Sequence, residues 1–70
     1  MATIEIGRFD GELKKLVVDD KTTISKALDM AGLKLASGEE VNTSRAEAKK
    51  GDDRVDDGEQ YLVVGNYKSG

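Results

Sequence analysis

The sequence predicts an α+β protein in which one helix packs across a mixed sheet of four or five strands. Three observations lead to this prediction: a strand-turn-strand pattern near the start, a single amphipathic helix after it, and a strongly apolar strand near the end. The chain has 70 residues, enough for one small core. Because a helix laid on a sheet buries an apolar face of each, we expect residues 1–70 to form a single domain, with residues 66–70 as a flexible tail.

The first two predicted strands form a hairpin. Residues 3–9 (TIEIGRF) alternate between apolar and polar positions, which is the period of a strand with one buried face. Asp10 and Gly11 follow, and an Asp-Gly pair between two strand-like runs is a strong signal for a tight turn. Residues 13–18 (LKKLVV) supply the returning strand, so we expect the turn near residues 9–12.

A helix is predicted over residues 23–31. The threonine pair at 22–23 can cap its N-terminus, and Gly32 stands where a glycine commonly ends a helix. Its apolar positions follow the spacing i, i+3, i+4, i+7 and are Ile24, Ala27, Leu28 and Ala31. We expect Leu33 and Leu35 to fold back onto the last turn of this helix.

Residues 34–51 carry a weaker pattern that allows two interpretations. In the first, residues 40–43 and 45–48 are short strands joined by a bend. In the second, residues 43–50 (TSRAEAKK) form a helix, because alanine, glutamate and lysine favour one.

The strongest strand signal lies near the end of the chain. Residues 52–57 are predicted to form a loop around Val55, whose side chain is the only apolar one there and is expected to enter the core. After a turn at Gly58, residues 60–64 (QYLVV) form an apolar run that is typical of a central strand with both faces covered or nearly so. We expect the chain to be mobile from Tyr67 onward.

The composition excludes several kinds of chemistry. With no cysteine and no histidine, the chain has no Cys or His nucleophile, no imidazole base, no Cys/His zinc site and no cysteine-ligated iron–sulfur cluster. Its net charge is −3 and its basic residues are dispersed, which disfavours binding to nucleic acid or an anionic membrane. Since no apolar run matches a membrane span or a signal peptide, we expect a cytoplasmic protein, in the host cytoplasm if the chain is viral.

Acidic side chains gather just before the last predicted strand, at Asp52, Asp53, Asp56, Asp57 and Glu59. Carboxylates at this density can ligate Ca²⁺ or Mg²⁺, but an EF-hand frame that starts at Asp53 places Val55 and Val64 at ligand positions. General acid or base catalysis would need a pocket that raises one carboxyl pKa, and one small core has little room for it. We therefore expect a solvated turn, no metal, no cofactor and no enzymatic activity.

Residues 53–64 (DRVDDGEQYLVV), together with the hairpin and the helix before them, give the chain a recognisable order of elements. This order resembles the ubiquitin-like β-grasp proteins. The pattern is most similar to the small prokaryotic sulfur-carrier proteins of thiamine and molybdopterin synthesis, in which an Asp-Gly turn precedes the last strand. The resemblance implies a β-grasp fold and a carrier whose C-terminal carboxylate is adenylated with ATP and converted to a thiocarboxylate. Those carriers end in Gly-Gly, whereas this sequence ends in Ser69-Gly70.

Two functional hypotheses follow. The first is a small protein-interaction module, because a sheet with one face under a helix leaves the opposite face exposed. Its partner is expected to be a protein, the chain itself a monomer, and the candidate surface residues are Arg8, Lys15, Arg45, Tyr61, Tyr67 and Lys68. The alternative is a sulfur carrier or protein modifier that acts through the carboxylate of Gly70.

Overall fold

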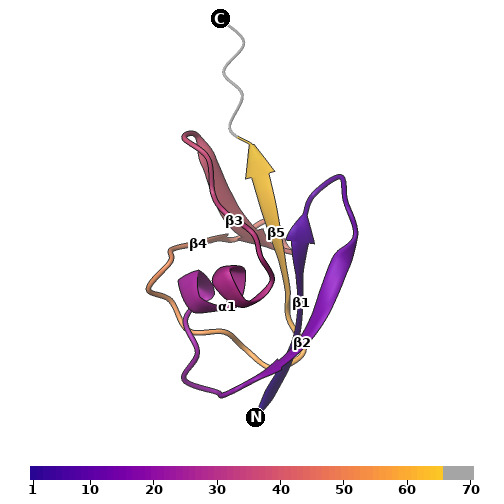
Figure 1. Ribbon diagram of the computed structural model, residues 1–70, viewed down its shortest axis with the longest axis vertical. Coiled ribbons are helices and arrows are strands. Elements are labelled where there is room, and N and C mark those ends of the chain that lie inside the picture. Colours follow the sequence, from indigo (N-terminus) through magenta and orange to yellow (C-terminus); the bar gives the residue numbers. More distant parts are fainter. Residues whose placement is uncertain (66–70) are drawn as a thin grey trace, which may run out of the picture.

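The computed structural model describes residues 1–65, which form one α-helix and a five-stranded mixed sheet (Figure 1). In chain order the elements are β1 (Ala2–Arg8), β2 (Leu13–Val18), α1 (Ile24–Met30), β3 (Glu39–Thr43), β4 (Ala48–Lys49) and β5 (Gln60–Gly65). In space the strands follow the order β2-β1-β5-β3-β4, in which β1 and β5 are parallel and the other neighbours antiparallel. The predicted α+β class is confirmed, and this strand order is compatible with a β-grasp fold.

The predicted hairpin is present as β1 and β2. Its register runs from Ala2 opposite Val18 to Gly7 opposite Leu13. Gly7 is required by the return of the chain, because a Cβ at this position would overlap the carbonyl oxygen of Glu12. The turn therefore folds directly against the end of β1.

The predicted helix is also present, with both of its ends capped. The side-chain oxygen of Thr23 accepts a hydrogen bond from the Lys26 N–H at 3.2 Å. At the other end Gly32 adopts a φ of 73°, and the Leu33 N–H donates to the Leu28 carbonyl at 2.9 Å. These contacts form a Schellman motif, which explains why the helix ends where glycine is available. Among residues 1–65 no helix has the length and apolar character needed to cross a membrane.

The core lies between α1 and one face of the sheet. Its fully buried large side chains are Ile4, Ile6, Ile24, Val41 and Tyr61. Val55 is buried as predicted and joins the same cluster from the loop before β5. The Tyr61 hydroxyl accepts a hydrogen bond from the Asp56 N–H at 2.8 Å, so the loop is tied to the core by a polar contact as well.

Residues 39–50 confirm part of the first interpretation. The predicted strand over 40–43 is present as β3, and it pairs across a turn with a second short strand, β4. That second strand lies at Ala48–Lys49, so its predicted bounds of 45–48 are corrected, and the alternative helix over 43–50 is wrong. The turn is held by Thr43, whose N–H donates to the Glu47 carbonyl at 2.9 Å and whose carbonyl accepts from the Ala46 N–H at 2.9 Å. Ala46 adopts a φ of 64°, which no helix permits.

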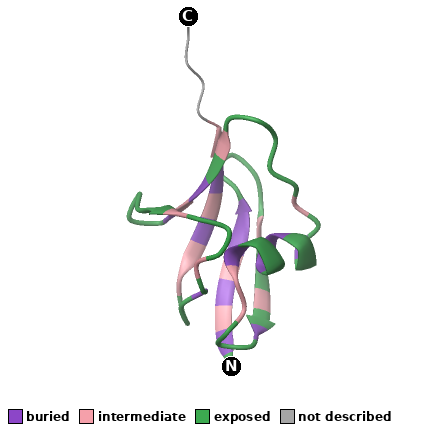
Figure 2. Ribbon diagram, turned by 90° about the vertical axis from the view of Figure 1, so that its left-hand side faces the viewer, coloured by how far each residue is buried: buried purple, intermediate pink, exposed green. Residues whose placement is uncertain are grey.

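Strand β5 is central as predicted, but only one of its faces is covered. Tyr61 and Val63 are buried, whereas Leu62 and Val64 are only half-buried. Figure 2 shows this alternation as bands along the strands. The prediction that both faces of the run are covered or nearly so is corrected, because the seven-residue α1 lies across one face.

Candidate functional site

The open face is the side of the sheet opposite α1. Residues alternate between the two faces along each strand, and cross-strand partners share a face, so the register places each side chain. The open face includes Glu5 of β1, Lys15 and Val17 of β2, Asn42 of β3, and Leu62 and Val64 of β5. It combines the regular geometry of the strands with apolar side chains that remain partly or largely exposed.

An apolar patch, formed by Leu13, Leu62 and Val64, lies on the open face toward the ends of β1 and β5. Leu13 packs over Gly7, where a Cβ would lie 3.0 Å from its side chain, and Leu62 lies beside Gly7 on β5. All three patch residues are half-buried. Farther along β2, Val17 is 57% exposed. None of these residues was among the predicted surface residues, although one short helix cannot cover both faces of a strand such as residues 60–64 (QYLVV).

A polar row crosses the open face next to the apolar patch. Lys15 lies opposite Glu5, and the Glu5 carboxylate accepts a hydrogen bond from the Gln60 side chain at 2.9 Å. The row gives the face charges of both signs, which is a composition that suits a moderate protein interface.

The row continues into a cluster around Glu59, just before β5. The Glu59 carboxylate accepts hydrogen bonds from the Gln60 N–H at 3.0 Å, the Ser44 hydroxyl at 3.1 Å and Arg45 at 3.1 Å. The Gln60 hydrogen bond, together with the Ser44 hydroxyl and the Arg45 charge, holds the pKa of Glu59 below its usual value of 4.5. The cluster therefore fastens the β3–β4 turn to the start of β5.

Asn42 is an unusual residue on the open face. It lies between Leu62 of β5 and Ala48 of β4, and its side-chain oxygen is buried. Within the described residues this oxygen has no hydrogen-bond partner. An unpaired buried acceptor lowers the free energy of unfolding by about 1–3 kcal/mol, so we expect Asn42 to destabilise the fold.

The predicted surface residues do not form one surface. Lys15 lies on the open face, but Arg8 lies on the helix side, where it contacts Glu39 at 2.7 Å and the Lys34 carbonyl at 3.1 Å. Arg45 lies in the turn before β4, paired with the Glu59 carboxylate. These two arginines are thus engaged within the chain.

The prediction of an exposed Tyr61 is wrong, because its side chain is 0% exposed in the core. Its burial also raises the pKa of its hydroxyl. Tyr61 was predicted as a surface residue, whereas the register places it on the helix side of the sheet. Tyr67, Lys68 and Gly70, as well as the expected mobility from Tyr67 onward, lie outside the described residues.

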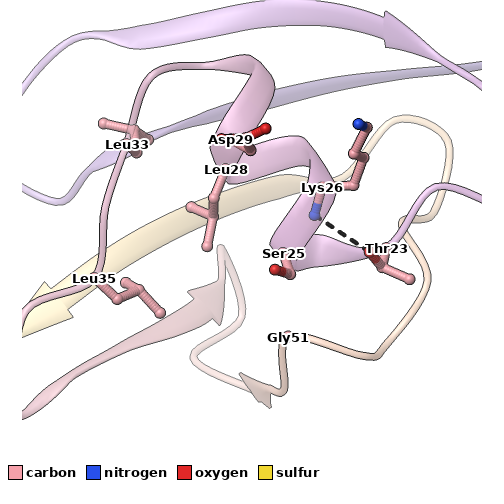
Figure 3. Close-up of a pocket in the computed structure, with 8 residues that line it drawn as sticks. All are labelled: Thr23, Ser25, Lys26, Leu28, Asp29, Leu33, Leu35 and Gly51. Atoms are coloured by element: carbon pink, nitrogen blue, oxygen red, sulfur yellow. Dashed lines mark hydrogen bonds between the residues drawn. The ribbon is translucent and has the colours of Figure 1, made fainter.

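Two hollows lie beside the elements of the fold. One, of about 550 Å³, lies between α1 and the loop at Gly51. Figure 3 shows Leu28 and Leu35 turned toward this space while Lys26 extends away from it. Leu33 packs against the core as predicted, whereas Leu35 is 42% exposed and lines this hollow together with Leu28.

The second hollow, of about 450 Å³, lies at the end of β1 and β5. Its lining includes Phe9, which is 71% exposed, beside Val64 of the apolar patch and the Arg8–Glu39 ion pair. The Glu39 pKa is lowered by a hydrogen bond from the Ala36 N–H and by Arg8. The hollow extends the apolar surface of the open face around the ends of β1 and β5.

The acidic loop, residues 52–59, has a structural role that its sequence did not predict. The Asp57 carboxylate accepts a hydrogen bond from the Thr3 N–H at 2.7 Å, and the Asp53 carboxylate accepts one from the Lys50 N–H at 2.8 Å. The expected solvated turn is therefore also a set of hydrogen-bond acceptors that fix the loop. Within residues 1–65 no group of three or more acidic side chains is arranged to hold a metal ion.

Comparison of the sequence with protein-family models gives no match, and no curated protein matches the chain.

Proposed function

We propose that the chain is a small protein-interaction module of β-grasp type, without catalytic activity of its own, that binds a partner protein through the open face. The observation that carries this proposal is the apolar patch on the uncovered side of the central strand β5. Leu62 and Val64 belong to the most apolar segment of the sequence, yet α1 covers only Tyr61 and Val63. A partner that covers this side would bury apolar surface that folding alone leaves in water.

The charges of the chain support a binding role over a catalytic one. The two carboxylates whose pKa is lowered, Glu39 and Glu59, are paired with Arg8 and Arg45. A general acid would instead need a raised pKa and a position in a cleft. The strand order, with its parallel β1 and β5 at the centre, supports the β-grasp assignment.

The test is capture of a native partner by matched variants. The tagged chain is incubated with lysate of the source cells, and the experiment is repeated with Leu62→Lys on the open face and with Lys26→Glu on the exposed side of α1. Circular dichroism and thermal unfolding verify that both variants are folded, and Val64→Lys replaces Leu62→Lys if the latter is not.

We expect a stoichiometric partner with the unmodified chain and with Lys26→Glu, and its loss with Leu62→Lys. The proposal is contradicted if no stoichiometric partner is recovered at low or high salt. Equal capture by all variants would also contradict it, because the partner would then bind elsewhere.

A second candidate function is a sulfur carrier or protein modifier that acts through the carboxylate of Gly70. The strand order favours it, since it is compatible with the fold that the resemblance implies. The chain would be incubated with an adenylating enzyme, ATP and a sulfur donor, and its intact mass measured. A mass change that corresponds to a thiocarboxylate, and that is absent after deletion of Gly70, is expected; an unchanged mass would rule this function out for that enzyme class.

A further inference from the structure

The outer edge of β2 is a long and regular strand edge whose charged residues are both lysines. β2 lies at one end of the sheet, and its six pairs with β1 follow one another without a bulge. Within residues 1–65, no loop or turn makes a backbone hydrogen bond to residues 13–18. Such an edge presents unpaired N–H and C=O groups that another strand can use.

The opposite edge of the sheet differs. It is formed by β4, which has only the residues Ala48–Lys49, and a two-residue strand offers few groups for pairing. Proteins otherwise protect their edges with prolines, bulges or charged side chains. The chain has no proline and β2 pairs with β1 without a bulge, so of these features β2 has only charged side chains, those of Lys14 and Lys15.

The two lysines point to opposite sides of the sheet. Lys14 lies on the helix side, where its ammonium donates to the Ala31 carbonyl at 3.1 Å. Lys15 lies on the open face, and among residues 1–65 no carboxylate lies within ion-pair distance of its ammonium. The acids that follow β2 are engaged within the chain: Asp19 accepts from the Lys21 N–H at 2.8 Å, and Asp20 contacts the N-terminal ammonium at 3.2 Å.

We propose that β2 accepts an extended segment of a partner protein as an added strand. The segment has two consecutive acidic residues opposite Lys14 and Lys15, one for each side of the sheet, and apolar residues opposite Leu16, Val17 and Val18. Main-chain hydrogen bonds supply the binding, and the lysines select the acidic register. This inference rests on the proposed function and deepens it, because the added strand extends the open face beyond Lys15 and Val17.

A second copy of the chain fits this edge poorly. If two copies pair antiparallel with their helices on the same side, a register centred on Lys15 places the two Lys15 side chains directly opposite each other. A register centred on Leu16 places them on the diagonal, roughly 7–8 Å apart. Like charges destabilise both arrangements, whereas an acidic strand turns the same positions into favourable pairs.

The test uses blocked synthetic peptides as probes of the complete chain. One contains Val-Val-Val-Glu-Glu for antiparallel addition, another Glu-Glu-Val-Val-Val for parallel addition, and a third replaces both glutamates by lysine. Two further peptides repeat the sequence of the better binder with N-methyl groups on alternate residues, one at the odd positions and the other at the even positions. In each of them, one edge of the peptide backbone cannot donate hydrogen bonds to β2. Binding is measured by calorimetry, and amide exchange of β2 is followed by NMR.

We expect one acidic peptide to bind, to slow the exchange of alternate amides in β2, and to bind roughly tenfold more weakly to Lys14→Glu/Lys15→Glu. Lys21→Glu/Lys26→Glu is the matched control and should bind as the unmodified chain does. One of the two N-methylated peptides, the one whose methyl groups lie on the edge that pairs with β2, should not bind.

Four results would overturn the inference: no peptide binds, the lysine peptide binds as well as the acidic ones, neither N-methylated peptide is weakened, or β2 amides are unprotected in the complex. Concentration-dependent dimerisation through β2, measured by sedimentation, would also overturn it in favour of a second copy. Because the probes need no native partner, these results are separate from capture through Leu62. Loss of capture by Leu62→Lys together with failure of the peptides would retain the proposed function and discard the added strand.

Discussion

The two faces of the sheet are built from the same strands yet differ in what their side chains do. On the covered face, Ile6 and Tyr61 pack beneath α1 and are fully buried. On the open face, their neighbours Leu62 and Glu5 remain partly in water. The difference teaches that adjacent positions of one strand can be separated into folding and binding roles, because the alternation of side chains puts them on opposite sides.

The largest expected effect compares one residue from each face. Ile6→Ala should lower the free energy of unfolding by about 2–5 kcal/mol, because it removes fully buried methyl groups and leaves a cavity. Leu62→Ala should cost only about 1 kcal/mol, since that side chain is half-buried. Urea unfolding of both variants measures the difference. Equal losses would mean that the open face belongs to the folding core.

A second substitution tests the close packing of the open face at Gly7. Gly7→Ala should destabilise the fold by about 1–3 kcal/mol, because the new Cβ would overlap the Glu12 carbonyl and crowd Leu13. Gly11→Ala is the control, as its Cβ would lie 3.7 Å from the nearest atom, an ordinary contact. Thermal unfolding compares the two, and a Gly7→Ala chain as stable as the control would show that the hairpin turn can move away.

Asn42→Val should act in the opposite direction. It removes the buried side-chain oxygen that lacks a partner and adds a residue that favours strands, so we expect a gain of about 1 kcal/mol. Chemical denaturation gives the change, and Glu40→Val, at an exposed position of the same strand, serves as a control. A loss of stability would indicate that the Asn42 amide is hydrogen-bonded in solution.

The smallest effect is a dependence of stability on acid. The pKa of Glu59 in the folded chain is lowered from 4.5, so its contribution is complete above that value and is lost as the pH falls through the folded-state pKa. Glu59→Gln should therefore reduce the loss of stability between neutral and acidic pH. Unfolding curves of this variant and of the unmodified chain at both pH values decide this. An identical pH dependence in the two chains would show that the cluster at Ser44 and Arg45 does not persist in solution.

Sequence patterns were sufficient for the elements whose signals are local. The Asp10-Gly11 turn marks the hairpin, and Gly32 marks the end of α1, because turns and caps depend on a few neighbouring residues. The buried position of Val55 could also be predicted, since it stands alone among acids. The turn over residues 44–47 could not, because Ala46 has no local preference for its left-handed conformation and is held there by contacts of Thr43.

The open face could not be predicted from local sequence patterns, because it depends on which strands pair and in which register. The sequence by itself determined one helix, a hairpin and an apolar last strand, and so determined that the chain is α+β. Only the tertiary structure decided which side of that last strand faces α1, and therefore that Tyr61 is in the core while Leu62 and Val64 lie on the open face. The physical reason is that a strand period of two gives two equivalent faces, and the register with β1 and β3, set by residues far apart in the chain, selects between them.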